Sequence, residues 1–249
     1  MPENPSNHAS EHDPKPMYLH GREGDPCGSK GAYMQFKLSC GAHAPRMPAT
    51  SRNPNAFDES YNIAKTTLLE LQSQKNMPNI IVGSSFGGAV LMKLIQEGFW
   101  KGPSIFLASA HMKQAIRETY QLPLWDALPS NHRAIFIHST TDALVLYQDS
   151  VDTINNSKIR NGDQGILELW TARSPSIEKD PCGNHRLHEI TKDGSLQRAI
   201  EQLTGLTIPE NDEQTCRDLC TKKCDGCDRF NDLEIPVQDI EFSCIPSIS

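Results

Sequence analysis

Several features common in other protein classes are missing from this chain of 249 residues. It has no internal repeat and no apolar run long enough to span a membrane. Its 24 basic and 31 acidic side chains give a net charge of -7, and no basic patch with interleaved aromatics occurs, so nucleic acid is not an expected partner. Neither a Walker motif nor a dinucleotide fingerprint is present, so the sequence predicts no nucleotide cofactor.

The first 16 residues also lack the marks of a targeting signal, namely a basic start and an apolar core. They are rich in proline, asparagine, serine and glutamate, a composition that cannot repay the entropy of ordering. We therefore expect residues 1–16 to form a disordered tail and the protein to be cytoplasmic. The sequence predicts no particular protein partner.

Residues 83–87 read Gly-Ser-Ser-Phe-Gly and fit the nucleophile-elbow pattern Gly-x-Ser-x-Gly. Such an elbow holds its serine on a strained turn between a strand and a helix, and the flanking glycines let the two elements approach closely. An apolar strand is predicted at 79–83, and helix formers fill 86–97. Ser85 is therefore the candidate nucleophile.

Partners for this serine follow along the chain in the order acid, then histidine, which the elbow fold requires. Asp142 comes shortly after an apolar run at 134–138 that predicts a strand. His185 lies in the loop that follows another predicted strand at 165–170. The sequence thus offers a Ser85, Asp142 and His185 triad.

Four segments resemble motifs of the α/β-hydrolases. Residues 18–24, Tyr-Leu-His-Gly-Arg-Glu-Gly, resemble the family's first oxyanion loop, and Gly-Ser-Lys at 28–30 is similar to a Ser-x-Lys stretch of small bacterial esterases. Residues 137–145 are similar to the family's His-Gly-x-x-Asp-x-x-Val stretch, and 183–187 to its Gly-Asp-His-Arg-Leu. The segment from about 17 to 206 therefore resembles a small α/β-hydrolase of the bacterial serine-esterase type.

The resemblance implies a serine esterase or thioesterase that needs no cofactor for hydrolysis. His185 would take the proton of Ser85 as general base, and Asp142 would orient the imidazole and stabilise its cation. The backbone N–H groups of Phe86 and Arg22 would bind the oxyanion. The expected partner is a small acyl ester or thioester substrate.

Other residues could fill some of these roles. Asp149 and Asp152 are alternative acids, but both fall in a helix predicted at 148–155. His188 is an alternative base three residues after His185. In the family the histidine at position 20 organises the oxyanion loop, while His111 and His138 are expected to be polar loop or strand-end residues rather than metal ligands.

The chain also departs from the family. Arg22 and Glu23 make the oxyanion loop more charged than usual, and 34–48, where a strand is normal, has little β-branched content.

Predicted helices at 61–75, 86–97 and 196–203 alternate with the predicted strands, including one at 104–108. This alternation predicts an α/β fold, a mostly parallel sheet with helices on both faces. We expect three regions: the tail 1–16, a hydrolase domain at 17–206, and an extension at 207–249. Only about 25 residues separate the strands at 104–108 and 134–138, so any cap is small or absent.

The residues between those two strands can be interpreted in two ways. They could line an acyl or alcohol pocket, or they could form a simple helix packed over the sheet. The side chains concerned are aromatic or apolar for the most part: His111, Tyr120, Leu122, Leu124 and Trp125.

The C-terminal extension is rich in cysteine, with Cys216, Cys220, Cys224 and Cys227 spaced C-x3-C-x3-C-x2-C. Four thiolates suit a tetrahedral zinc site, so zinc on these cysteines is one hypothesis. The spacing of the last three also matches cluster-binding enzymes that use S-adenosylmethionine, although a short tail is the wrong place for that cluster. A redox-active or disordered tail is the remaining alternative. Disulfides among these tail cysteines are less expected, because no export signal is found.

Two hypotheses about function remain open. The first is a serine hydrolase that forms an acyl-enzyme at Ser85. The second is an inert hydrolase-fold binding or scaffold protein, with the cysteine-rich tail as its interaction surface. The intact triad pattern favours the first.

Overall fold

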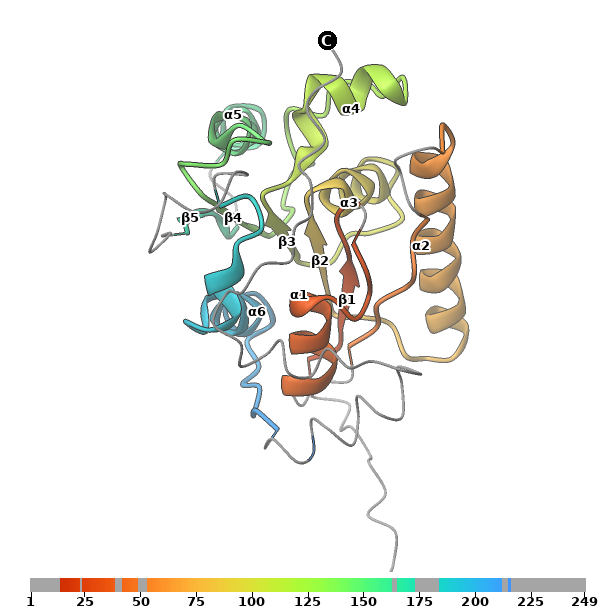
Figure 1. The fold of residues 1–249 in the computed structure, drawn as a ribbon. Coiled ribbons are helices and arrows are strands. Elements are labelled where there is room, and N and C mark those ends of the chain that lie inside the picture. The colour runs from red at the N-terminus through yellow and green to blue at the C-terminus, as the bar shows by residue number, and fades with distance from the viewer. Residues whose placement is uncertain are drawn as a thin grey trace, which may run out of the picture.

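Five parallel strands form one sheet in the order in which they occur along the chain (Figure 1). The computed structural model describes residues 14–22, 24–38, 42–48, 53–162, 165–172, 184–211 and 215. The strands are β1 (Pro16–Leu19), β2 (Ile80–Ser84), β3 (Ser104–Leu107), β4 (Ala134–His138) and β5 (Leu167–Thr171). Side chains of β1 to β4 are buried throughout, as expected for parallel strands that are covered on both faces.

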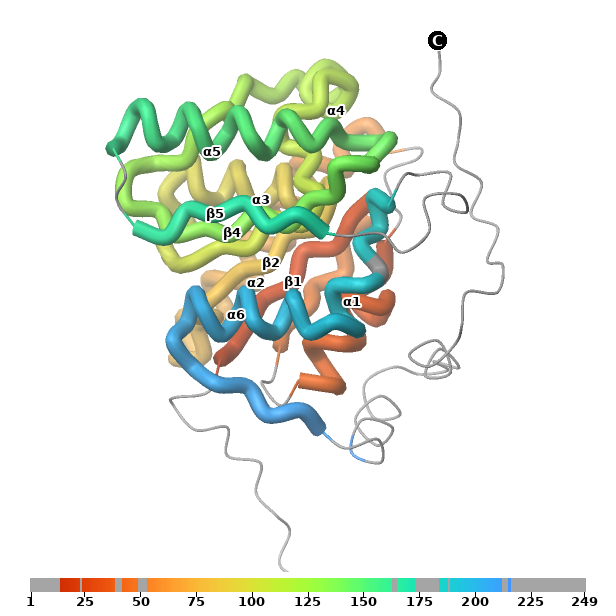
Figure 2. The backbone as a smooth tube through the Cα atoms, turned by 90° about the vertical axis from the view of Figure 1, so that its left-hand side faces the viewer, coloured from red at the N-terminus to blue at the C-terminus, as the bar shows by residue number. Residues whose placement is uncertain are grey.

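Helices cover both faces of this sheet (Figure 2). The longer ones are α2 (Ala56–Ser73), α3 (Phe86–Gln96), α5 (Tyr147–Asn161) and α6 (Ser195–Thr204). The shorter ones are α1 (Ser29–Ala32), the π-helical turn η1 (Tyr33–Lys37), the 3-10 turns η2 (Ala110–Met112) and η3 (His188–Thr191), and α4 (Gln114–Thr119). The predicted α/β architecture is therefore confirmed.

Successive residues of each strand point into two separate cores, because strand side chains alternate between the faces of a sheet. Ile81 and Phe106 pack with α2, α3 and Ile154 of α5. Val82 and Ile105 pack on the opposite face with η1 and α6. Both faces of the sheet are therefore packed against helices. The loops that follow β1, β2 and β4 lie at the carboxyl ends of these strands.

Most predicted elements lie within a few residues of the observed ones, and the largest differences concern helix length. Helix α2 begins at Ala56 rather than at 61, and α5 continues to Asn161 rather than ending at 155. The added residues of α5 are largely exposed, and Ile159 is 81% accessible. They lack the regular spacing of apolar residues from which the shorter helix was predicted.

The segment with the weakly encoded strand forms helical turns in its first part. Residues 34–37 belong to η1, and among the described residues of the segment only single bridges pair Leu38 with Glu210 and His43 with Met17. The low β-branched content of this segment agrees with the absence of a full strand among its described residues.

Both ends of the predicted hydrolase domain extend by a few residues. At the first end, β1 begins at Pro16, and the backbone of Lys15 bonds to Asn79, so the predicted disorder of 1–16 is wrong for these last residues. At the other end, Ile208 is buried in the core, and Asn211 bonds to the backbone of η1. The described body of the domain therefore extends to Asn211, beyond the predicted border at 206.

One cysteine lies among the described residues. Cys27, in the turn before α1, is disulfide-bonded. The other seven of the eight cysteines, including Cys216, Cys220, Cys224 and Cys227, lie outside the described residues. In the part of the chain that the structure describes, no helix has the length and apolar character needed to cross a membrane.

Because two histidines are buried, we expect the protein to lose stability in mild acid. His111 bonds to Ser109 and Thr153, and His132 bonds to Ser104. Burial lowers the pKa of His111 to about 3 and that of His132 to about 4. Both therefore stay neutral in the folded state below pH 6.5, where an unfolded histidine binds a proton, so unfolding takes up protons as the pH falls.

Each histidine is expected to lower the free energy of unfolding by about 1.4 kcal/mol per pH unit between pH 6.5 and about 4, which gives about 4 kcal/mol for the pair at pH 5. Urea unfolding at several pH values measures this slope. His132→Gln should reduce the slope of the free energy of unfolding against pH by about 1.4 kcal/mol per pH unit, because unfolding then takes up one proton fewer. An unchanged slope in that variant would show that His132 does not take up a proton on unfolding.

Candidate active site

Ser85 occupies the turn between β2 and α3 in an unusual backbone conformation. Its φ of 50° and ψ of -114° lie in a region that residues with a side chain rarely adopt. The turn is fixed by hydrogen bonds, because the N–H of Ser85 donates to Leu107 O at 2.8 Å and the N–H of Ala110 donates to Ser85 O at 3.0 Å. The surrounding β3 segment thus holds a strained serine at the carboxyl end of the sheet.

Two glycines allow the strand and the helix to meet at this turn. A Cβ atom on Gly83 would lie 2.8 Å from Gly87 O, and one on Gly87 would lie 2.2 Å from Leu19 O. Real Cβ atoms do not approach backbone oxygens so closely, so larger residues would force β1, β2 and α3 apart. The structure therefore has the close packing that the elbow pattern predicts.

The side chains of Ser85, His185 and Asp142 form a continuous hydrogen-bonded chain, although 100 residues separate the first two in sequence. His185 Nε2 lies 2.9 Å from Ser85 Oγ, and His185 Nδ1 lies 2.7 Å from Asp142 Oδ2. The imidazole is 12% exposed and the Asp142 side chain is fully buried. Because a carboxylate only accepts, Nδ1 carries the proton and Nε2 is free to accept the serine O–H.

The two alternative acids lie away from the Ser85–His185 contact. Asp149 and Asp152 lie on α5, where Asp152 accepts a hydrogen bond from Gln148. His188 opens η3, one turn beyond His185, and the histidine that meets Ser85 is His185.

Hydrogen bonds keep Asp142 ionised although it is buried. Burial by itself would raise the pKa of Asp142, but donors from His138, His185 and the Val145 backbone outweigh it and hold that pKa well below its ordinary value. The N–H groups of Leu144 and Val145 donate to Oδ1 at 2.8 and 2.9 Å. The carboxylate therefore offers a fixed negative charge to the imidazole.

The loop after β1 lies directly beside the serine. A Cβ atom on Gly21 would be 3.3 Å from the Cβ of Ser85. His20 organises this loop as the sequence predicts, because its Nε2 accepts the N–H of Met47 at 3.0 Å and its Nδ1 donates to Gly21 O at 3.0 Å. Arg22 follows Gly21 in the chain, at an exposed turn.

Lys30 connects this region to the histidine loop, a contact that sequence reasoning missed. Its buried ammonium donates a hydrogen bond to the carbonyl of Arg186, the residue after His185. Burial, and secondarily the charge of Arg186, lower the pKa of Lys30 to about 8. The only sequence signal for this contact is the Ser-x-Lys similarity, which gives no indication of the partner.

The segment between β3 and β4 contains two short helices, η2 and α4. Its side chains range from buried to exposed. Tyr120, Leu122 and Trp125 are partly buried against the core. Tyr120 also contacts the ring of Phe86, the residue after the serine, with 5.8 Å between ring centroids. Leu124 is 49% exposed, whereas His111 is fully buried and bonds to Ser109 and Thr153. For His111, the interpretation as part of a helix packed over the sheet therefore fits better than the interpretation as pocket lining.

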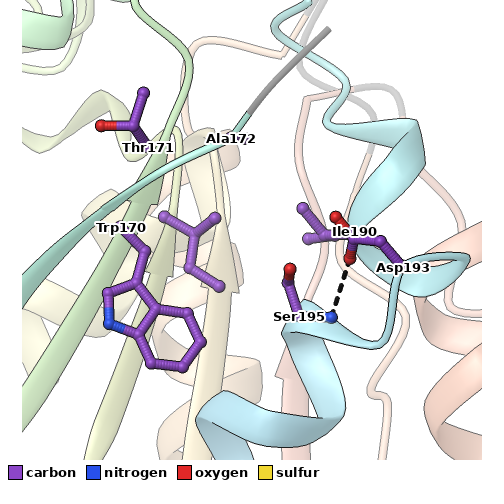
Figure 3. Close-up of a pocket in the computed structure, with 7 residues that line it drawn as sticks. Trp170, Thr171, Ala172, Ile190, Asp193 and Ser195 are labelled. Carbon is purple, nitrogen blue, oxygen red and sulfur yellow. Dashed lines mark hydrogen bonds between the residues drawn. The ribbon is translucent and has the colours of Figure 1, made fainter. Parts of the chain in front are cut away.

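A cavity of about 220 Å³ opens beside the carboxyl ends of β4 and β5, and Ser85 is not among the residues that line it. Figure 3 shows Trp170 and Thr171 on one side and Ile190, Asp193 and Ser195 on the other. The N–H of Ser195, the first residue of α6, donates to the carboxylate of Asp193 at 2.8 Å. Because Ser85 does not line this cavity, we do not assign it as an acyl pocket.

Metal ligands do not gather at this site. Within the described ranges, no group of three or more histidine, cysteine, aspartate or glutamate side chains is arranged to hold a metal ion. The cysteines of the proposed zinc site lie outside those ranges.

Comparison with known proteins identifies the fold. No protein-family model matches the sequence, and no curated protein does either. Among solved structures, TT1662 from Thermus thermophilus is 16% identical with a TM-score of 0.53, over 77% of this chain and 90% of its own. MGS-M1, an α/β-hydrolase enzyme from a deep-sea metagenome library, is 15% identical with a TM-score of 0.51, over 78% and 86%.

The carboxylesterase Cest-2923 from Lactobacillus plantarum is similar to the same extent. It is 13% identical with a TM-score of 0.53, and the match covers 81% of this chain and 90% of that one. At such identities the likeness concerns the fold. The chain has the α/β-hydrolase fold, with only η2 and α4 between β3 and β4, and the resemblance to that fold is confirmed.

Proposed function

We propose that this protein is a serine hydrolase that cleaves carboxylic esters or thioesters through an acyl-enzyme on Ser85. The observation that supports it most is the hydrogen-bonded chain from Ser85 Oγ through His185 to Asp142, with distances of 2.9 and 2.7 Å. A serine hydroxyl is a weak nucleophile at neutral pH and needs such a base. The strained elbow and the α/β-hydrolase fold are consistent with this chemistry.

The proposed reaction begins when Ser85 Oγ attacks the carbonyl carbon of the substrate while His185 Nε2 takes the serine proton. Asp142 stabilises the imidazolium that forms. The backbone N–H groups of Phe86 and Arg22 would bind the oxyanion of the tetrahedral intermediate. His185 then returns the proton to the leaving alcohol or thiol, and water repeats the sequence on the acyl-enzyme to release the acid.

A panel of p-nitrophenyl esters and acyl-thioesters of graded acyl length tests this proposal. We expect turnover of at least one class, with a preference for one acyl length. Because Cest-2923 is named a carboxylesterase, esters are the first class to test. The competing hypothesis, an inert hydrolase-fold scaffold, predicts no turnover and no covalent labelling of Ser85, and such a result would refute our proposal.

Zinc on the C-terminal cysteines remains a separate hypothesis, because Cys216, Cys220, Cys224 and Cys227 are not described in the structure. If they bind zinc, protein purified with zinc and a reductant should carry about one metal ion per chain, released by a thiol-blocking reagent. Deletion of 216–249 should remove the metal and leave hydrolysis largely unchanged. Elemental analysis measures the metal, and a metal-free preparation would contradict the hypothesis.

That deletion keeps Glu210 and Asn211, which anchor the chain to η1 through an ion pair with Lys37 and two hydrogen bonds to the backbone. Loss of hydrolysis in the shortened protein would therefore show that the tail itself contributes to the active domain. A cytoplasmic location also remains a prediction. The disulfide at Cys27 is more typical of an oxidising compartment.

A further inference from the structure

A second histidine contacts the same carboxylate oxygen that binds His185. His138, the last residue of β4, is fully buried, and its Nε2 lies 3.1 Å from Asp142 Oδ2. The same nitrogen lies 3.1 Å from Val145 O. Since both neighbours are acceptors, Nε2 must carry a proton and donate it. Asp142 Oδ2 therefore receives two imidazole N–H groups, one from each histidine.

The other side of the His138 ring fixes its protonation. Nδ1 lies 2.8 Å from the hydroxyl oxygen of Ser150, a buried residue of α5. A neutral ring with its proton on Nε2 accepts the Ser150 O–H, so every polar group of the pair is satisfied. A cationic ring would instead make Ser150 an acceptor and leave its buried hydroxyl proton without this partner. The geometry thus favours the neutral ring.

We infer that His138 is a positioning residue, which aims Asp142 Oδ2 at His185 and moderates the negative charge that this oxygen presents to the catalytic imidazole. The inference rests on the proposed function. The donated N–H takes up part of the charge on Oδ2, so the carboxylate stabilises the His185 imidazolium less than a carboxylate without that donor would.

Other groups that face His138 could also influence a pH profile. On α5, Asp149 acts on the ring electrostatically, and burial raises the pKa of this carboxyl. The Tyr147 ring contacts His138 edge to face, with 5.7 Å between centroids. His111 belongs to η2. Burial lowers its pKa to about 3, so its ring stays neutral over pH 5 to 8. Asp149 is therefore the group to control for.

A matched pair of substitutions separates donation from packing. His138→Gln keeps an N–H donor at nearly the position of Nε2, whereas His138→Met fills a similar volume without one. We expect His138→Met to lower kcat about 10-fold at pH 7 with KM unchanged, the scale of one lost hydrogen bond to a charged group. It should also move the acid limb of kcat/KM upward by about half a pH unit or more. His138→Gln should restore the limb and most of the rate, and Asp149→Asn should leave both nearly unchanged.

A purely structural role would lower the melting temperature and the rate without moving the acid limb. Equal losses in His138→Met and His138→Gln, with an unmoved limb, would overturn the inference. Ser150→Ala, which removes the group that fixes the tautomer, should move the limb in the same direction by a smaller amount. This variant provides the test if His138→Met does not fold, and an unmoved limb in Ser150→Ala would then overturn the inference.

The inference and the proposed function can fail separately. An NMR titration of the His185 ring needs no turnover, and its midpoint should move upward in His138→Met relative to the wild type. If the wild type turns over no ester or thioester and Ser85 is not labelled, the proposed function fails, while this titration still decides the role of His138. If the wild type is active and neither the limb nor the midpoint moves, only the inference fails.

Discussion

Replacing Ser85 with alanine is expected to reduce ester or thioester turnover by about 10⁴- to 10⁶-fold. The substitution removes the oxygen that would form the acyl-enzyme, and no other hydroxyl is bonded to His185 Nε2 in the described structure. Folding should be preserved, because alanine keeps the Cβ atom and can occupy the same strained turn at φ 50°. Steady-state kinetics and a thermal melt of the same preparation measure the two effects.

Ser84→Ala provides the matched control for this experiment. Ser84 is the neighbouring serine, the last residue of β2, and its side chain bonds to Tyr18 rather than to His185. This variant should keep most of the activity. Full turnover in Ser85→Ala, or equal loss in both variants, would show that Ser85 is not the nucleophile.

His185→Ala is expected to have an effect nearly as large as that of Ser85→Ala, because the residues of a triad act as a unit. Without the imidazole, Ser85 has no base at 2.9 Å, and Asp142 is left as a buried carboxylate without one of its donors. Activity of the wild type should fall on acidification, since only a neutral imidazole can accept the serine proton. Kinetics of the wild type over pH 5 to 8, and of the Ser85→Ala and His185→Ala variants at neutral pH, measure these effects.

His188→Ala is the comparison for the base. It removes the neighbouring histidine and should reduce the rate by no more than a few-fold, because His185 is the residue that bonds to Ser85. If His188→Ala were the more damaging change, the assignment of the base would be wrong.

The sheet and the three residues of the site were accessible from sequence because each leaves a local pattern. Apolar runs mark β2, β3 and β4, and the glycines at 83 and 87 mark a place where the backbone must approach Leu19 closely. Asp142 and His185 could be predicted because each follows a strand, and parallel strands bring their carboxyl ends to one edge of a sheet. The chain order then associates them with Ser85.

Features that depend on long-range contacts could not be predicted from the sequence. The contact of Lys30 with Arg186 spans 156 residues, and no local period reports it. His138 looked like a polar strand end, although its spacing of four residues from Asp142, across the turn after β4, was a usable signal. The disulfide of Cys27 could not be predicted either, because sequence alone does not show which cysteines approach each other in the fold.

The central claim is that Ser85 is an activated nucleophile, and covalent labelling with a fluorophosphonate tests it most directly. After treatment of the wild-type protein, mass spectrometry of the intact chain should show one added group, and peptide mapping should place it on Ser85. Ser84→Ala should label as the wild type does, and Ser85→Ala should not label. An unlabelled wild-type chain, or a label on a residue other than Ser85, would contradict the account.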